Sequence, residues 1–247
     1  MKKYRTILAL FVLFIIWEFL AIQIDNDFLF PYPLDVIALM GKQVMTASFY
    51  STLGITLVRS LSGLCIAFIL AFLCAFLSYK SNVFKDLFYP VLLLTRSVPN
   101  ISYIIIVLVW FGRDRSASIV SFLIIFPTIY SSLFQGFLHI QQNLKNVLRL
   151  YPTKKSYQIW YVYIPLLQSA MQASLSNGIS LAFKVGVMAE IIGQVQTGVG
   201  RQLNLCRLNS DMTGIFAWTG WIIIVLLFME GMQHVLFQKK NASETTH

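Results

Sequence analysis

The sequence predicts an all-α, polytopic membrane protein with about six transmembrane helices. Of its 247 residues, 57% are hydrophobic and only 12% are charged, whereas a soluble domain carries about 25% charged residues. The hydrophobic residues are also gathered into runs of about 20, the length of helix that crosses a bilayer. The mean hydropathy of +0.70 agrees with both observations. We therefore treat residues 1–247 as a single transmembrane domain.

Six runs are long and apolar enough to be membrane spans. The first follows Met-Lys-Lys-Tyr-Arg and is too long for the core of a signal peptide, so we expect it to be retained. The predicted spans are residues 7–24, 57–79, 87–110, 116–138, 164–189 and 213–237.

Three segments outside the spans have predicted structures of their own. Residues 28–50 form an extracellular linker, in which Pro31 and Pro33 break the backbone before a short interfacial helix. Residues 141–163 form two short cytosolic helices. The polar tail, residues 239–247, is expected to be disordered.

The orientation follows from the basic residues, because cytoplasmic loops carry an excess of Lys and Arg. This excess occurs at both termini and in the loops around residues 80 and 150, and it accounts for the net charge of +9 without nucleic acid. The residues concerned are Lys2, Lys3, Arg5, Lys80, Lys85, Lys145, Arg149, Lys154, Lys155, Lys239 and Lys240. Both termini are therefore predicted to be cytoplasmic.

The cytosolic segment has the pattern of two amphipathic helices. Apolar residues recur at helical spacing up to Tyr151, Pro152 ends the first helix, and Thr153 can cap the second. The apolar face of the second helix consists of Ile159, Trp160 and Tyr163. From these residues alone, a helix pair lying on the lipid headgroups is as good an explanation as a docking element for another protein.

Four ionisable side chains lie within the predicted spans, where a charge is costly and is a candidate for function. They are Glu18, Arg96, Lys184 and Glu230. Counting about 1.5 Å per residue from the span ends, we expect Glu18 to lie at the depth of Lys184, and Arg96 at the depth of Glu230. We therefore predict two ion pairs that stabilise the bundle, with contact to a transported solute as the alternative.

The fifth span carries a polar residue at every fourth position. These residues are Gln168, Gln172, Ser176, Ser180 and Lys184, and such a row stays near one face of a helix. Hydrogen bonding between helices could explain it, but we prefer the wall of a translocation path, because the row covers much of the membrane thickness. On the second span, the small residues Gly63, Ala67, Ala71 and Ala75 predict close helix packing.

The sequence holds no pattern typical of an enzyme or a metal site. Cys65, Cys74 and Cys206 lack ligand or disulfide spacing. The Gly-x4-Gly-Lys-Ser/Thr phosphate loop is also missing, so we expect no ATP hydrolysis by this chain.

Several short segments resemble, in order, those of permease subunits of nitrate/sulfonate/taurine-type ABC importers. They are Phe30-Pro31-Tyr32-Pro33-Leu34-Asp35-Val36, Arg96-Ser97-Val98-Pro99, Trp110-Phe111-Gly112, Ala189-Glu190-Ile191-Ile192-Gly193 and Thr197-Gly198-Val199-Gly200. The cytosolic segment is also similar to that family's loop, Glu-Ala-Ala, three residues, Gly, nine residues, Ile, one residue, Leu-Pro. It matches at Val147, Leu148, Val162 and Ile164-Pro165, and departs where Asn146 replaces the Glu and Pro152 the Gly.

The resemblance implies the type I (MetI-like) permease fold of ABC importers. It also implies a permease homodimer in the bacterial cytoplasmic membrane, two cytosolic ATP-binding subunits that hold ATP and Mg, and an extracytoplasmic solute-binding protein. The helix after Thr153 would then be a coupling helix. The residues expected at the ATPase contact are Asn146, Pro152, Thr153, Ile159, Trp160, Tyr163 and Pro165.

The transported solute is less defined. The cations Arg96 and Lys184 favour an anion such as a sulfonate, nitrate or taurine, whereas the abundant aromatic residues allow a pyrimidine-type vitamin precursor or another small organic solute. A secondary transporter is the competing class. It would be expected to show an internal repeat, and the sequence contains none.

Overall fold

The computed structural model describes residues 2–139, 157, 161 and 163–244. All regular elements in these residues are helices, which confirms the predicted all-α class. They are α1 (Lys2–Ile24), α2 (Pro33–Val44), α3 (Ala47–Lys80), α4 (Asn82–Ser97), α5 (Asn100–Phe111), α6 (Arg113–Leu138), α9 (Ile164–Leu166), α10 (Gln168–Ile192), α11 (Val199–Leu208) and α12 (Met212–Glu244).

Four helices in the described residues are long and apolar enough to cross a membrane, and a fifth span results if α4 and α5 are counted together. The four segments are Ala47–Lys80, Arg115–Leu138, Gln168–Ile192 and Met212–Gln233. The predicted first span coincides with α1, whose described apolar stretch is the shorter Phe11–Ile24. The multi-pass architecture is therefore confirmed.

One predicted span is broken. Residues 87–110 were expected to form a single helix, but α4 and α5 meet at an angle of 99°. Pro99 cannot donate a backbone hydrogen bond, and it forces the preceding residue out of the helical region. Val98 accordingly has an extended backbone with ψ 128°. The chain therefore turns at Val98-Pro99 and not at the end of the apolar run.

Other boundaries also differ from the predictions. α3 begins ten residues before the predicted second span, at Ala47, and the short helix α11 was not predicted at all. α12 continues to Glu244, so residues 239–244 extend a helix where disorder was expected. Gln, Lys and Ala are good helix formers and can carry a helix beyond its apolar part.

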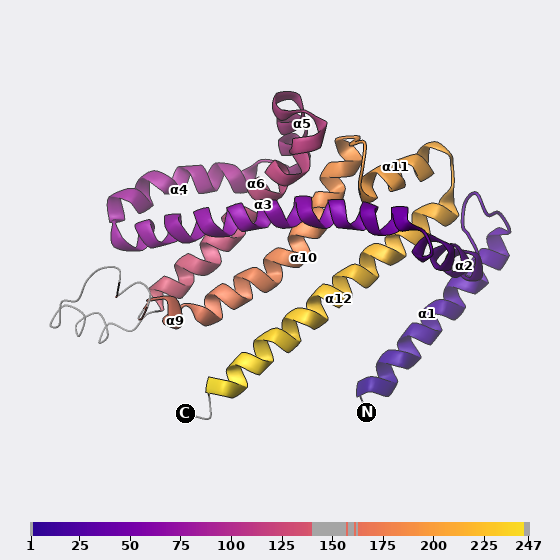
Figure 1. The fold of residues 1–247 in the computed structure, drawn as a ribbon, viewed down its shortest axis with the longest axis horizontal. Helices are drawn as coiled ribbons and strands as arrows, with labels where there is room; N and C mark the ends of the chain where they lie inside the picture. The colour runs from indigo at the N-terminus through magenta and orange to yellow at the C-terminus, as the bar shows by residue number, and fades with distance from the viewer. Residues whose placement is uncertain (1, 140–156, 158–160, 162, 245–247) are drawn as a thin grey trace.

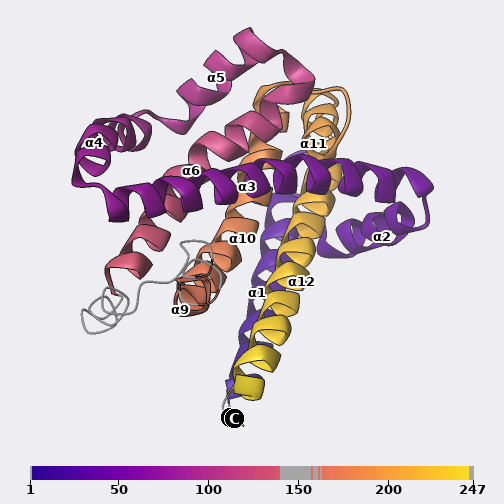
Figure 2. The same ribbon diagram turned by 60° about the vertical axis from the view of Figure 1, so that its left-hand side comes forward.

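The centre of the molecule is the packing of α3, α6 and α10 (Figures 1 and 2). The buried face of α3 contains the predicted small-residue row, Gly63, Ala67, Ala71 and Ala75, and the three alanines are fully buried. The start of α1 and the end of α12 lie on the same side of the molecule in both views.

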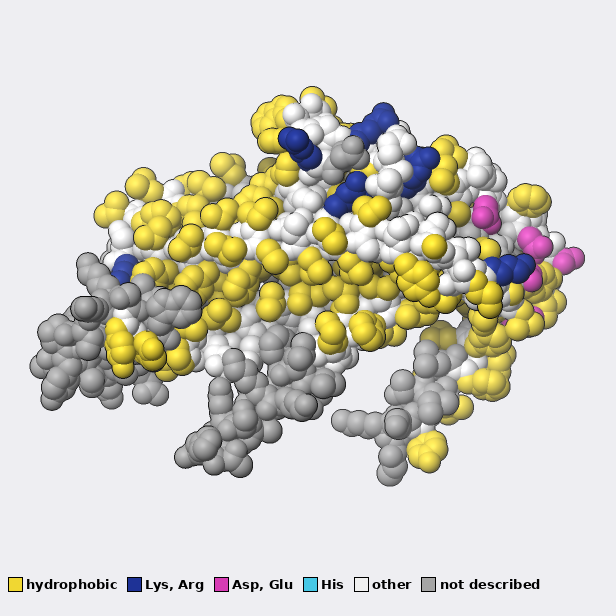
Figure 3. All heavy atoms as spheres, in the orientation of Figure 1, with side chains coloured by type: hydrophobic (Ala, Val, Ile, Leu, Met, Phe, Trp, Pro, Cys, Tyr) yellow, Lys and Arg dark blue, Asp and Glu magenta, His cyan; other side chains and the backbone are white. Residues whose placement is uncertain are grey.

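Much of the outer surface is apolar. Figure 3 shows hydrophobic side chains spread over the visible face, with most of the visible charged side chains toward its upper and right-hand edges. The exposed side chains of α3 include Ile66, Ile69, Leu73 and Leu77. An apolar surface this extensive is typical of a protein in contact with lipid.

Gly63 lies in close contact with α6, and its replacement tests the packing of α3 against α6. A Cβ at this position would meet the carbonyl oxygen of Ser118 and would lie 2.8 Å from the Cβ of Ser121. We expect Gly63→Ala to lower the stability of the purified protein by about 1–3 kcal/mol, because the backbones must move apart. Thermal unfolding in detergent measures the effect.

Gly54 on the same helix is the matched control. Nothing lies within 4 Å of a Cβ at this position, and alanine is the better helix former. Gly54→Ala should therefore leave the unfolding midpoint unchanged or raise it. Equal losses in the two variants would contradict the close α3–α6 packing.

Candidate functional site

A polar cavity lies between the two apolar helices α10 and α12. It has a volume of about 470 Å³ and is lined by Ser176, Asn177, Ser180, Leu181, Lys184 and Glu230. Two hydrogen bonds cross from α10 to α12: the Ser176 hydroxyl donates to Oε1 of Gln233 at 2.7 Å, and the Ser180 hydroxyl donates to Oε1 of Glu230 at 3.2 Å. The cavity therefore offers hydroxyl, amide and charged groups within a span-length helix pair.

The predicted polar row on α10 enters this cavity only in part. Ser176, Ser180 and Lys184 line it, whereas Gln168 and Gln172 do not. Each step of four residues rotates the side chain by about 40° around the helix, so the two ends of the row point in different directions.

The charges in the cavity have opposite signs. Lys184 and Glu230 are both exposed to it, from α10 and α12 respectively. The cavity can thus contact a negative and a positive part of one small solute. Besides Leu181, its described lining is polar, and no aromatic ring is part of it.

Neither predicted ion pair forms. The backbones of α1 and α10 do not approach each other, so Glu18 lies away from Lys184, and Oε2 of Glu18 is buried without a hydrogen-bond partner among the described residues. Arg96 on α4 bonds to α6, while Glu230 on α12 accepts from α10. Equal depth in the membrane does not make two helices neighbours, and this is why both pairings were wrong.

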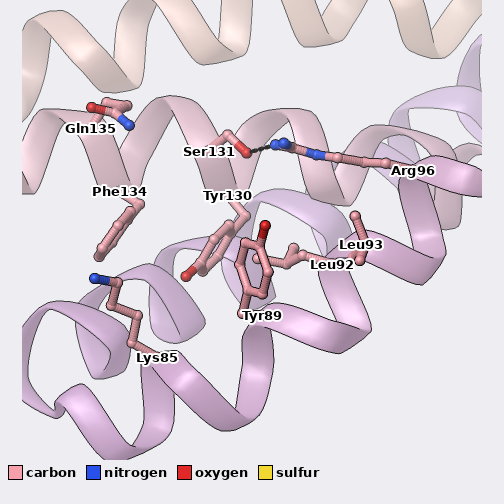
Figure 4. A pocket seen from close by; sticks show the side chains of 9 residues that line it. All are labelled: Lys85, Tyr89, Leu92, Leu93, Arg96, Tyr130, Ser131, Phe134 and Gln135. Atoms are coloured by element: carbon pink, nitrogen blue, oxygen red, sulfur yellow. Dashed lines mark hydrogen bonds between the residues drawn. The ribbon is translucent and has the colours of Figure 1, made fainter.

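A second cavity, of about 290 Å³, lies between α4 and α6 (Figure 4). It is lined by Lys85, Tyr89, Leu92, Leu93, Arg96, Tyr130, Ser131, Phe134 and Gln135. The Arg96 guanidinium donates to the Ser131 hydroxyl and, at 3.4 Å, to the carbonyl oxygen of Pro127. Arg96 therefore belongs to a different site from Lys184 and Glu230.

A buried carboxylate holds the corner between α10 and α11, and we did not select it from the sequence. Glu190 is fully buried near the end of α10. Its oxygens accept from the Thr56 hydroxyl at 2.9 Å, the Gly200 backbone N–H at 3.0 Å and Nη1 of Arg59 at 3.3 Å. The positive end of the α11 dipole favours the negative charge at this place.

The α10–α11 loop closes around this carboxylate. Arg59 also donates from Nη1 to the Thr197 carbonyl oxygen at 2.8 Å, and the Val199 backbone N–H donates to the Thr56 hydroxyl at 2.8 Å. Gly198 has φ +109°, and a Cβ at this position would lie 2.5 Å from a Glu190 oxygen. Only glycine fits such a place. The sequence signal that could have identified this site is an acidic residue near the end of an apolar span, Glu190, followed by the closely spaced Gly198 and Gly200.

Most residues predicted to contact an ATPase lie outside the described part of the chain. These are Asn146, Pro152, Thr153, Ile159 and Trp160. Pro165 is described: it lies in the short helix α9, just before α10, and its side chain is exposed. Tyr163 was predicted to lie on the docking face for the ATPase, and the structure contradicts this. Its side chain is only 9% exposed, and its ring packs against Phe76 and Tyr79. It therefore belongs to the helix core and not to a docking face.

Comparison with known proteins gives a consistent picture. A family model described as "Binding-protein-dependent transport system inner membrane component" matches residues 63–241. The glycine betaine/carnitine transport permease protein GbuB of Listeria monocytogenes is 24% identical over 202 residues, covering 81% of this chain and 71% of the relative.

Two further relatives are named for other solutes. The putative aliphatic sulfonates transport permease protein SsuC of Bacillus subtilis is 23% identical and covers 94% of this chain and 86% of its own length. The formylaminopyrimidine transport permease protein ThiX of Halalkalibacterium halodurans is 22% identical, with 83% and 82% covered. The family match, residues 63–241, includes the lining residues of both cavities and Glu190.

Proposed function

Because the chain belongs to the family of binding-protein-dependent transport system inner membrane components, it is a transmembrane permease of an ABC importer, and we propose that α10 and α12 line its translocation path. The observation that carries this proposal is the polar cavity between two span-length helices, with Ser176, Ser180, Lys184 and Glu230 in its wall. Polar and charged side chains at membrane depth are tolerated where they face a water-filled cavity, and they often mark the route of a solute.

We propose that this permease works as a homodimer in a bacterial cytoplasmic membrane, in contact with lipid and with both termini in the cytosol. Two cytosolic ATP-binding subunits would hold ATP and Mg and hydrolyse the ATP, because the chain has no phosphate loop of its own. An extracytoplasmic solute-binding protein would deliver the solute. Residues 141–163, between α6 and α10, would couple ATPase closure to the movement of these helices.

For the solute we propose a small anion of the sulfonate, nitrate or taurine type. Lys184 supplies the positive charge for the anionic group, and Glu230 is suited to an amino group at the other end of the solute. A pyrimidine-type vitamin precursor is the second candidate, which the relative ThiX favours. Among the described residues that line the cavity, none has an aromatic ring on which a pyrimidine could stack, and this supports the anion.

Co-expression with candidate ATP-binding subunits tests the assignment. We expect the permease to co-purify with an ATPase, and ATP hydrolysis in proteoliposomes to rise several-fold when the loaded binding protein is added. Uptake should require ATP and should survive collapse of ion gradients. A secondary transporter would show the reverse: uptake by this chain alone, without ATP and abolished when the ion gradient is removed.

A further inference from the structure

The cavity between α4 and α6 is a separate site of positive charge. It shares no lining residue with the α10–α12 cavity. Its α4 residues, positions 85, 89, 92, 93 and 96, lie along one face of the helix. Lys85 and Arg96 mark the two ends of this face, and both side chains extend into the space beside α6 in Figure 4. The helix rise between them is roughly 16 Å.

No carboxylate lines this cavity in the part of the chain that the structure describes. Asp86 follows Lys85 directly, but it projects from another face of α4 and is not part of the lining. Both hydrogen bonds of Arg96 go through Nη2 to neutral oxygens, those of Ser131 and Pro127. The positive charge of Arg96 is therefore held in place but not neutralised.

The contact with Ser131 orients the guanidinium. The Ser131 hydroxyl donates its own proton to the Pro127 carbonyl oxygen at 2.7 Å, so its lone pairs are directed to Arg96. The remaining guanidinium nitrogens make no hydrogen bond within the described residues, although a guanidinium carries five N–H donors. A cation held at a membrane-spanning segment without a counter-charge is costly unless an anion joins it.

The other lining residues suit a ligand with an apolar part. Leu92 is buried, Leu93 is exposed, and Phe134 and Tyr89 supply aromatic surface along the same groove. The Tyr130 hydroxyl is already engaged, because it donates to Ser78 at 2.8 Å. Gln135 adds an exposed amide at the rim. A volume of about 290 Å³ accommodates an oxyanion group with a few carbon atoms attached.

We propose that the α4–α6 cavity binds an oxyanion group, such as a sulfonate, phosphate or carboxylate, against Arg96, with Lys85 adding positive charge at the other end of the cavity. The apolar part of the same molecule lies against Leu92, Leu93 and Phe134. This group belongs either to a small organic anion in solution or to the headgroup of an anionic phospholipid. Binding at this site does not depend on transport through the α10–α12 cavity.

Thermal unfolding of the full chain in lipid nanodiscs tests the site with two probes. Ethanesulfonate is titrated into phosphatidylcholine nanodiscs, and phosphatidylglycerol is separately introduced in increasing proportion. We expect at least one probe to raise the unfolding midpoint. In Arg96→Gln the concentration needed for half of this effect should rise at least about tenfold, as the loss of a charge-assisted contact predicts.

Lys85→Gln is a second test of the site that remains informative if Arg96→Gln does not fold. Lys85 is exposed, so its charge can be removed without disturbing the core. It should show a smaller loss of the same response. Arg113→Gln is the matched control, since Arg113 is exposed and lies outside the cavity, and it should respond like the natural protein. A response to ethanesulfonate identifies a soluble ligand, and one to phosphatidylglycerol alone identifies a lipid. The proposal fails if neither probe acts, or if all three variants respond alike.

Discussion

Replacing Glu190 by alanine should lower the free energy of unfolding by about 3–5 kcal/mol, the cost of removing one partner of a buried ion pair. The Glu190 side chain is fully buried, and the Arg59 side chain is 16% exposed. Glu190→Ala would leave the Arg59 guanidinium, the Thr56 hydroxyl and the Gly200 N–H without their shared acceptor. Thermal unfolding of the purified chain measures the loss.

Cys206 on α11 reports whether the loss is local to this corner. Burial, reinforced by the nearby Asp211, raises the pKa of the Cys206 thiol to about 11. Maleimides react with the thiolate, so at pH 7.5 the thiol should react slowly. When Glu190→Ala releases α11, the pKa should fall toward its usual value and labelling should become at least about tenfold faster. A background with Cys65→Ser and Cys74→Ser isolates this signal.

Glu18 supplies the matched control for the buried carboxylate. One of its oxygens is buried without a partner among the described residues, so Glu18→Ala removes a charge but no hydrogen bond that the structure describes. It should leave stability unchanged or raise it, and Cys206 should stay protected. If Glu18→Ala and Glu190→Ala were equally harmful, the α10–α11 corner would not depend on the network around Glu190.

The double replacement of Ser176 and Ser180 by leucine should reduce solute uptake more than tenfold while leaving the permease assembled with its ATP-binding subunits. The two larger side chains would fill the α10–α12 cavity, and they would remove the hydrogen bonds to Gln233 and Glu230. An apolar wall offers no replacement for the water that a polar solute loses on entry. Uptake in proteoliposomes and co-purification are measured on the same preparation.

Thr219→Leu provides a control with the same kind of change on α12. Thr219 is exposed, and its hydroxyl donates only to the Ile215 carbonyl oxygen of its own helix, at 2.8 Å. It lies outside the cavity, so uptake should remain near that of the natural protein. Normal uptake by the double serine variant would show that the solute takes another route.

Composition and the length of the apolar runs were enough to predict the class and most of the spans. Transfer of an apolar run into lipid depends on local composition, so residues 116–138 coincide closely with α6, and residues 213–237 lie within α12. The break at Val98-Pro99 was also present in the sequence, since proline restricts its predecessor. Its effect was not predictable from the residues alone, because the size of the bend depends on how α4 and α5 pack against α6.

The candidate sites were less predictable than the spans. Lys184 and Glu230 were recognised as costly intramembrane charges and do line one cavity, yet each was assigned to the wrong partner. Glu190 was seen only as part of a family motif, because its importance depends on Thr56 and Arg59, more than 130 residues away in the chain.

By itself, the sequence determined that this protein is an all-helical membrane permease of an ABC importer, because hydropathy and short motifs are properties of neighbouring residues. Only the tertiary structure decided that Ser176, Lys184 and Glu230 share a cavity, that Arg96 faces a different one, and that Glu190 closes the α10–α11 corner. These pairings depend on which helices lie side by side and how each is rotated about its axis. Depth in the membrane is the same for many helix arrangements, whereas packing of small residues such as Gly63 against α6 selects one of them.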